Sequence, residues 1–420
     1  MTENDPTHPH DAKTSRRLIQ FGPAVLVTAA FIGPGTVTTA SIAGAEHGLG
    51  LLWTVFFASI GAIVLQSLAA RVGIIKKQGL AEAIFDSISN TPWIKPALFL
   101  IIAALGIGNA AYQAGNLTGA VAGLSALTNA PASILLVLIS CAAGLVFCLG
   151  NLKWLSRSLI VLVLLLSLSF FYTAIITFPD PKRLLHGLFS LSISSDQLTT
   201  FLAMIGTTIV PYNLFLHASS AAGTWRTTHV SQAIRNSNIE TVLAISVGGM
   251  ITASILITAS FAFHDRGITL ESTRDLPLQL RPTLGSFSTI AFAVGLFSAG
   301  FTSALTAPLA TAYAVTGCFG LTSEPKSKIF KFIALSVLII GAITALVFGK
   351  TPKLVILFAQ TANAILLPVV AIFLLYIASF QLPVNQRSRF PLQVTAAVVV
   401  TGVTLLALWK LQKLFIGIFS

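Results

Sequence analysis

The sequence predicts an all-α polytopic membrane protein, and three observations support that class. Hydrophobic residues make up 55% of the 420 residues and charged residues only 9%, less charge than a water-exposed surface of this size carries. Apolar runs of 18 or more residues recur along the whole chain, and each is long enough to cross a bilayer as a helix. The loops between these runs are short, so no soluble domain is expected.

The apolar runs predict eleven membrane-spanning helices, preceded by a polar segment at residues 1–17. That segment is too short to fold alone, and we expect a disordered cytoplasmic tail. In chain order, the spans are expected at residues 18–46, 49–72, 94–126, 131–150, 157–178, 197–222, 239–263, 285–316, 329–348, 353–379 and 391–417.

The positions of lysine and arginine predict the orientation of the chain. With the N-terminus inside, 16 of the 25 basic residues lie on the inner side and nine on the outer side. Because cytoplasmic loops carry an excess of Lys and Arg, we expect a multi-pass protein of the plasma (inner) membrane, with its N-terminus in the cytoplasm and its C-terminus outside. This topology also explains the net charge of +12, so no nucleic-acid partner is expected.

The first and sixth spans are each interrupted by a proline within a polar tetrapeptide. The two tetrapeptides are Gly33-Pro34-Gly35-Thr36 and Val210-Pro211-Tyr212-Asn213. A break frees backbone N–H and C=O groups, which lipid cannot satisfy, so they must face a cavity or a bound solute. One such proline alone would indicate only a kinked helix. Two breaks at the same rank in each half of the chain predict the binding site of a transporter.

The spacing of the two breaks predicts an internal repeat of five helices. Residues 18–178 would form the first repeat and residues 197–379 the second, with the helix at 391–417 as an addition. Because five is odd, the second copy is inverted in the membrane relative to the first. The sequence therefore predicts a LeuT-like fold, with two inverted five-helix repeats plus an eleventh helix.

Several segments along nearly the whole chain resemble the Nramp (natural resistance-associated macrophage protein) family of divalent-metal transporters. These segments are Gly33–Thr36 with Ile42–Ala45, then Leu65–Gly73, Pro211–His217, Thr302–Thr306 and Gln360. The resemblance implies the fold of that family and a role in moving a cation across the membrane.

The chain departs from the family at the residues that hold the metal. Where the family has an aspartate, an asparagine and a methionine, this chain has Gly33, Thr36 and Val210. The thioether that favours manganese and iron is therefore absent, and so is the negative charge. The metal donors that remain to be considered are Thr36, Asn213 and Gln360.

The proton pathway that the resemblance implies is altered as well. Gln113 and Asn116 occupy the places of an aspartate and a glutamate on the third helix, and neither can ionise. Tyr212 replaces one family histidine, whereas His217 keeps the other. Thr302 and Ser303, together with carbonyl groups near the first break, form a candidate site for a coupling ion such as sodium.

The positions of the acidic residues leave three functions open. All 13 lie near span ends or outside the spans, and a divalent cation stripped of water is costly to bury without anionic ligands. The resemblance favours a carrier that works by alternating access and binds a partly hydrated, magnesium-like divalent cation. The alternatives are a sodium-coupled or uncoupled carrier of a small polar or zwitterionic organic solute, and a non-transporting sensor.

The sequence thus predicts one substrate cavity near the membrane centre. Its expected lining is Gly33, Thr36, Val210, Tyr212, Asn213 and Gln360. No nucleophile–base pair and no metal-ligating cluster occurs in the sequence, so no enzyme and no cofactor are expected. The expected partners are the transported cation or solute and the lipid bilayer, and we expect a monomer.

Overall fold

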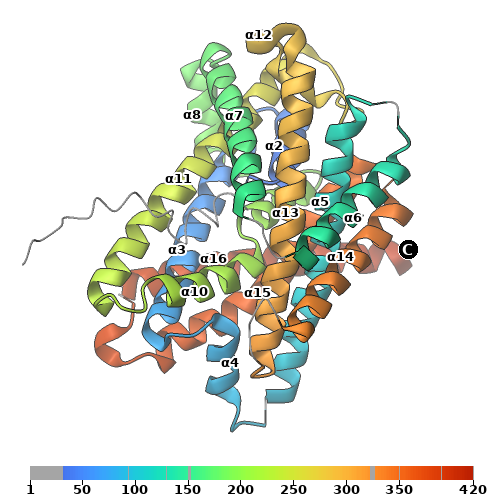
Figure 1. Ribbon diagram of the computed structural model, residues 1–420. Coiled ribbons are helices and arrows are strands. Elements are labelled where there is room, and N and C mark those ends of the chain that lie inside the picture. Colours follow the sequence, from blue (N-terminus) through green and yellow to red (C-terminus); the bar gives the residue numbers. More distant parts are fainter. Residues whose placement is uncertain are drawn as a thin grey trace, which may run out of the picture.

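The computed structural model describes residues 32–92, 94–128, 130–149, 153–321, 327–349, 351–388 and 390–419. This part of the chain forms a bundle of helices without a β-strand (Figure 1). Nine helical stretches within it are long and apolar enough to cross a membrane. The all-α membrane class is therefore confirmed. The expected tail at residues 1–17 and the beginning of the first span lie outside the described residues.

The first half of the chain folds into six described helices. They are α2 (Pro34–His47), α3 (Leu52–Lys76), α4 (Leu80–Ile88), α5 (Ile94–Ser125), α6 (Ala132–Leu149) and α7 (Lys153–Ile176). The second half continues with α8 (Pro181–Phe189), α9 (Leu198–Thr208), α10 (Pro211–Thr224), α11 (Val230–Ala262), α12 (Arg281–Leu284), α13 (Ser288–Cys318), α14 (Lys328–Phe348), α15 (Pro352–Tyr376) and α16 (Phe390–Phe419).

Both sequence breaks coincide with the start of a helix. Proline lacks an N–H group and fixes φ near the helical value, so it suits the first helical turn and opens both α2 and α10. The residue before each proline is extended, with φ −90° and ψ 176° at Gly33 and φ −80° and ψ 123° at Val210. The predicted sixth span is therefore two helices, because α9 ends at Thr208 before α10 begins.

The packing of the helices is reciprocal between the two halves. After the first break, α2 packs against α11, which corresponds to the second predicted span of the second repeat. After the second break, α10 packs against α3, the second helix of the first half. Two repeats related by an inverting two-fold axis give this exchange of partners. The helices α5 and α13, which correspond to the third predicted spans of the two repeats, also pack against each other.

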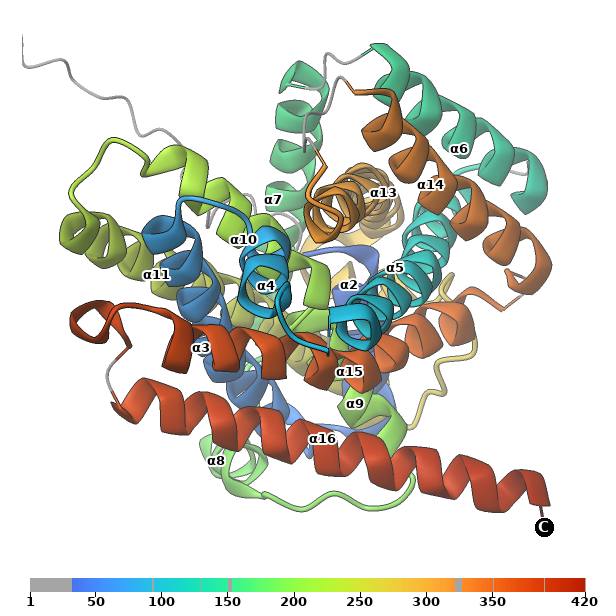
Figure 2. The ribbon, with the colours of Figure 1, turned by 90° about the horizontal axis from the view of Figure 1, so that it is seen from below.

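The additional last helix lies at the edge of the bundle. Figure 2 shows α2 inside the bundle, whereas α16 runs along its rim beside α15. That α16 is an addition to the two repeats stays a prediction.

Some element bounds differ from those expected. The helix α11 begins at Val230, nine residues before the predicted start at 239, because its first turns are polar and follow no apolar pattern. Two surface helices, α4 and α8, were not predicted, since each has only nine residues. One face of α4 is buried through Leu80, Ala81 and Ile84, which explains why so short a helix is ordered.

Candidate functional site

The two breaks meet through a pair of threonine side chains. Thr36 lies in the first turn of α2, and Thr207 lies in the last turn of α9. Their hydroxyl oxygens are 2.9 Å apart and form a buried hydrogen bond. The break in the first half is thus joined directly to the break in the second half.

Gln360 of α15 touches both breaks. A Cβ atom on Gly35 would overlap the side-chain amide nitrogen of Gln360 and lie 2.7 Å from its Cδ. A Cβ atom on Gly206 would overlap the backbone carbonyl of Gln360 and lie 2.9 Å from the Ala364 nitrogen. Glycine at both positions therefore allows α15 to approach the two broken segments closely.

Asn213 and Tyr212 are in the first turn of α10, directly after the second break. Both side chains are buried, and the ring of Tyr212 meets the ring of Tyr112 from α5 edge-on, with centroids 5.3 Å apart. Val210, the residue before the proline, is also buried, and its side chain offers no polar atom to the site.

Two buried amides at this place have no partner among the described residues. Both side-chain atoms of Gln360 and of Asn213 are without a hydrogen bond. An unsatisfied buried polar group costs about 1–3 kcal/mol, so such a group in a native protein needs an explanation. Amide groups gathered near two helix breaks are suited to bind water or a polar ligand.

The donors at this site are electrically neutral. They are amide and hydroxyl groups on α2, α10 and α15, and the described residues contain no group of three or more His, Cys, Asp or Glu that could hold a metal ion. Neutral oxygen atoms can contact the water shell of a cation, but they are poor sole ligands for a bare divalent ion.

The two coupling-ion candidates differ in their hydrogen bonds. Thr302 donates from its hydroxyl to the Ser298 carbonyl at 2.7 Å, which leaves it only lone pairs. The hydroxyl of Ser303 is buried and has no partner in the described part of the chain. Both residues lie on α13, which packs against α2.

Two of the three residues of the altered proton pathway join helices. Gln113 donates from Nε2 to the Ala304 carbonyl at 3.1 Å, which joins α5 to α13. His217 Nδ1 is 2.9 Å from Gln66 Oε1, which joins α10 to α3. These bonds place Gln113 and His217 in the helix packing, whereas Asn116 keeps both polar atoms unpaired among the described residues.

Three contact residues were not recognised from the sequence. They are Thr207, which bonds to Thr36, Gly206, which lies against Gln360, and Tyr112, whose ring meets that of Tyr212. The one signal for Thr207 is its position directly after a glycine and shortly before the second break. No pattern along the chain indicates that Tyr112 would face Tyr212.

The chain is similar to known membrane transporters over nearly its whole length. The family model described as "Natural resistance-associated macrophage protein-like" matches residues 24–413. A metal transporter of Arabidopsis thaliana, Nramp6, is 29% identical over 79% of this chain and 64% of its own length. A divalent metal cation transporter, MntH, of Acidiphilium cryptum is 25% identical over 86% of this chain and 82% of its own length.

Solved structures confirm the fold. The crystal structure of an Eremococcus coleocola manganese transporter in complex with an aromatic bis-isothiourea substituted compound aligns with a TM-score of 0.77 at 22% identity, over 95% of this chain and 87% of that one. MhsT in complex with L-phenylalanine aligns with a TM-score of 0.62 at 16% identity, over 93% and 97%. At these identities the likeness concerns the fold alone, and it confirms the predicted LeuT-like architecture.

Proposed function

Because the chain belongs to the natural resistance-associated macrophage protein-like family, we propose that it carries a divalent metal cation across the membrane by alternating access. The observation that carries this proposal is the meeting of the two helix breaks at Gln360, with Thr36 bonded to Thr207. A cation held there would contact helices of both repeats. Rocking of one repeat against the other would then expose it to each side in turn.

The neutral donors favour a cation that keeps part of its water shell. Magnesium loses its water reluctantly and is bound through several water molecules. These water molecules can donate hydrogen bonds to amide oxygens. The unpaired amides of Asn213 and Gln360 provide such oxygens. Val210 offers no sulfur to a soft metal, so manganese and iron gain no advantage. We therefore propose a magnesium-like selectivity.

The same residues argue against proton coupling through α5. Gln113 and Asn116 have no ionisable proton, and Gln113 is already bonded to the Ala304 carbonyl. Transport would be uncoupled or driven by sodium. If sodium drives transport, Ser303 is a stronger candidate ligand than Thr302, because its hydroxyl has no partner among the described residues.

A binding experiment on the purified protein tests the assigned site. Unfolding would be followed by thermal shift with magnesium, manganese, calcium and sodium, since a ligand stabilises the fold according to its occupancy. We expect stabilisation by magnesium, with loss of that effect in Asn213→Leu. Gln232→Leu is the matched control because it removes an exposed amide from α11. Equal magnesium stabilisation in wild type and Asn213→Leu would reject the site.

A specific observation supports a small zwitterionic solute as a second candidate. A hollow of about 540 Å³ is lined by Thr118, Ser125 and Arg274, among others. The hydroxyls of Thr118 and Ser125 are buried and unpaired within the described residues, and an arginine is a good partner for a carboxylate. Stabilisation by amino acids instead of metals would favour this candidate.

Ligand binding without any flux would favour a sensor.

A further inference from the structure

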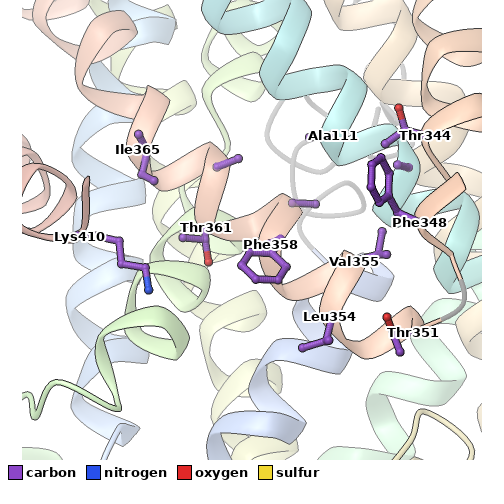
Figure 3. A pocket seen from close by; sticks show the side chains of 13 residues that line it. Ala111, Thr344, Phe348, Thr351, Leu354, Val355, Phe358, Thr361, Ile365 and Lys410 are labelled. Carbon is purple, nitrogen blue, oxygen red and sulfur yellow. The ribbon is translucent and has the colours of Figure 1, made fainter. Parts of the chain in front are cut away.

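A second hollow lies between helices at the rim of the bundle, apart from the breaks. Figure 3 shows this hollow, which has a volume of about 530 Å³ and runs along α15. Its wall is mainly apolar and is formed by Phe348, Leu354, Val355, Phe358 and Ile365. Other lining residues come from α5 and from α16, which contributes Lys410.

The apolar wall faces the lipid. Phe348, Leu354 and Phe358 are 64%, 45% and 59% exposed, although each belongs to a helix that is long and apolar enough to cross the membrane. Exposed apolar side chains at such positions contact acyl chains rather than water. The hollow is therefore a groove on the lipid-facing surface, called the α15 groove below.

Lys410 brings a positive charge to one end of the α15 groove, as Figure 3 shows. Its ammonium group donates to the hydroxyl of Thr199 at 2.6 Å, and a hydroxyl carries no compensating charge. Two ion pairs within the described residues join Arg183 to Asp265 and Lys353 to Glu46, and neither involves Lys410. A cation beside an apolar groove in the membrane is stabilised by an anion that can reach it from the lipid.

We propose that the α15 groove binds one anionic phospholipid of the bilayer. The phosphate would pair with Lys410, and an acyl chain would lie along Val355 and Phe358. Phospholipid fits both features of the groove, because it joins an anionic group to a long apolar chain. This proposal does not depend on which solute the protein carries.

A lipid in the α15 groove would lie beside helices that lead to the second break. Thr199, the partner of Lys410, lies in the first turn of α9, and α9 ends at the second break. Thr361 of α15 also lines the groove and donates to the Thr199 carbonyl at 3.4 Å. A phosphate bound to Lys410 would therefore act on α16 and α9 directly, and on α15 through Thr199.

Native mass spectrometry of the full-length protein tests the proposal. Phosphatidylglycerol and phosphatidylcholine with the same acyl chains would be titrated separately. We expect tighter binding of phosphatidylglycerol, and about a five-fold loss of that binding in Lys410→Gln, as expected for one lysine–phosphate attraction. Lys331→Gln is the matched control, because Lys331 also donates to a neutral oxygen, the Cys148 carbonyl at 3.4 Å, but lies outside the groove.

Two further experiments test the acyl-chain contact and distinguish a lipid from free phosphate. Phe358→Ala removes an exposed ring and should weaken binding of both lipids without unfolding the protein. Inorganic phosphate should not compete with phosphatidylglycerol, because it has no chain for the groove. Equal binding of both lipids by wild type, or unchanged phosphatidylglycerol binding in Lys410→Gln, would overturn the proposal. If Lys410→Gln fails to fold, Lys410→Arg should retain phosphatidylglycerol binding and Phe358→Ala should still weaken it. Loss of binding in Lys410→Arg, or unchanged binding in Phe358→Ala, would also overturn the proposal.

Discussion

The backbone of Gln360 lies directly against Gly206. A Cβ atom at Gly206 would overlap the Gln360 carbonyl, so the backbones of α15 and of the end of α9 are too close to admit a side chain between them. The side chain of the same glutamine lies against Gly35 at the other break. A single residue of α15 therefore contacts both broken segments, and its side-chain amide is unpaired among the described residues.

Gly206→Ala should destabilise the protein. The added methyl group meets backbone atoms, which cannot rotate away, so a loss of about 1–3 kcal/mol is expected from overpacking. Thermal unfolding in detergent measures it. Gly223→Ala is the control, since a Cβ atom there would meet nothing within 4 Å. A Gly206→Ala protein as stable as the control would contradict the close approach of α15.

The bond between Thr36 and Thr207 should appear as an energetic coupling between the two helix breaks. Replacing either hydroxyl with the methyl group of valine removes the 2.9 Å bond. The double variant should then be less destabilised than the sum of the single variants, by about 0.5–1.5 kcal/mol. Strictly additive losses in a double-mutant cycle would indicate that the two hydroxyls do not interact.

Restoring the ligand types of metal-binding relatives should change the preferred metal. Gly33→Asp, Thr36→Asn and Val210→Met together supply a carboxylate, an amide and a thioether. Calorimetry should then detect tighter manganese binding than in the wild type. Gly33→Asp and Thr36→Asn with Val210→Leu form the matched control, which lacks only the sulfur. If both combinations bind manganese no better than wild type, these three positions do not contact the metal.

Uptake should not be tightly coupled to proton entry through α5. Gln113 and Asn116 cannot titrate, and Nδ1 of His217 joins α10 to α3 through Gln66. In proteoliposomes with an internal pH dye, an imposed proton gradient should leave substrate uptake unchanged, whereas a sodium gradient is the alternative driver. Stoichiometric acidification that persists in His217→Ala would rule this out. A proton-driven flux that collapses in Gln113→Leu would do the same.

The architecture could be predicted from the sequence because its causes are local. Long apolar runs determine where helices cross the membrane, and Pro34 and Pro211 determine where two of them break. The polar start of α11 and the short surface helix α4 could not be predicted this way. Their stability comes from packing rather than from a continuous apolar run.

Contacts between distant segments were harder to predict than the breaks themselves. Sequence indicated that Thr36, Asn213 and Gln360 belong near the breaks. It gave no indication that Thr207 would bond to Thr36 or that Gly206 would admit the backbone of Gln360. Such contacts depend on how α2, α9 and α15 cross, which no periodicity along one helix encodes. That the six lining residues share one cavity stays a prediction.

Competitive uptake of magnesium and manganese into proteoliposomes tests the central claim most directly. The purified full-length protein would be reconstituted, and the entry of each metal would be measured alone and in the presence of the other. We predict that the protein takes up magnesium, and that manganese inhibits this uptake only when its concentration is comparable to that of magnesium. We also predict that Asn213→Leu abolishes magnesium uptake and that Gln232→Leu does not. Micromolar manganese uptake that is insensitive to a large excess of magnesium would contradict the account.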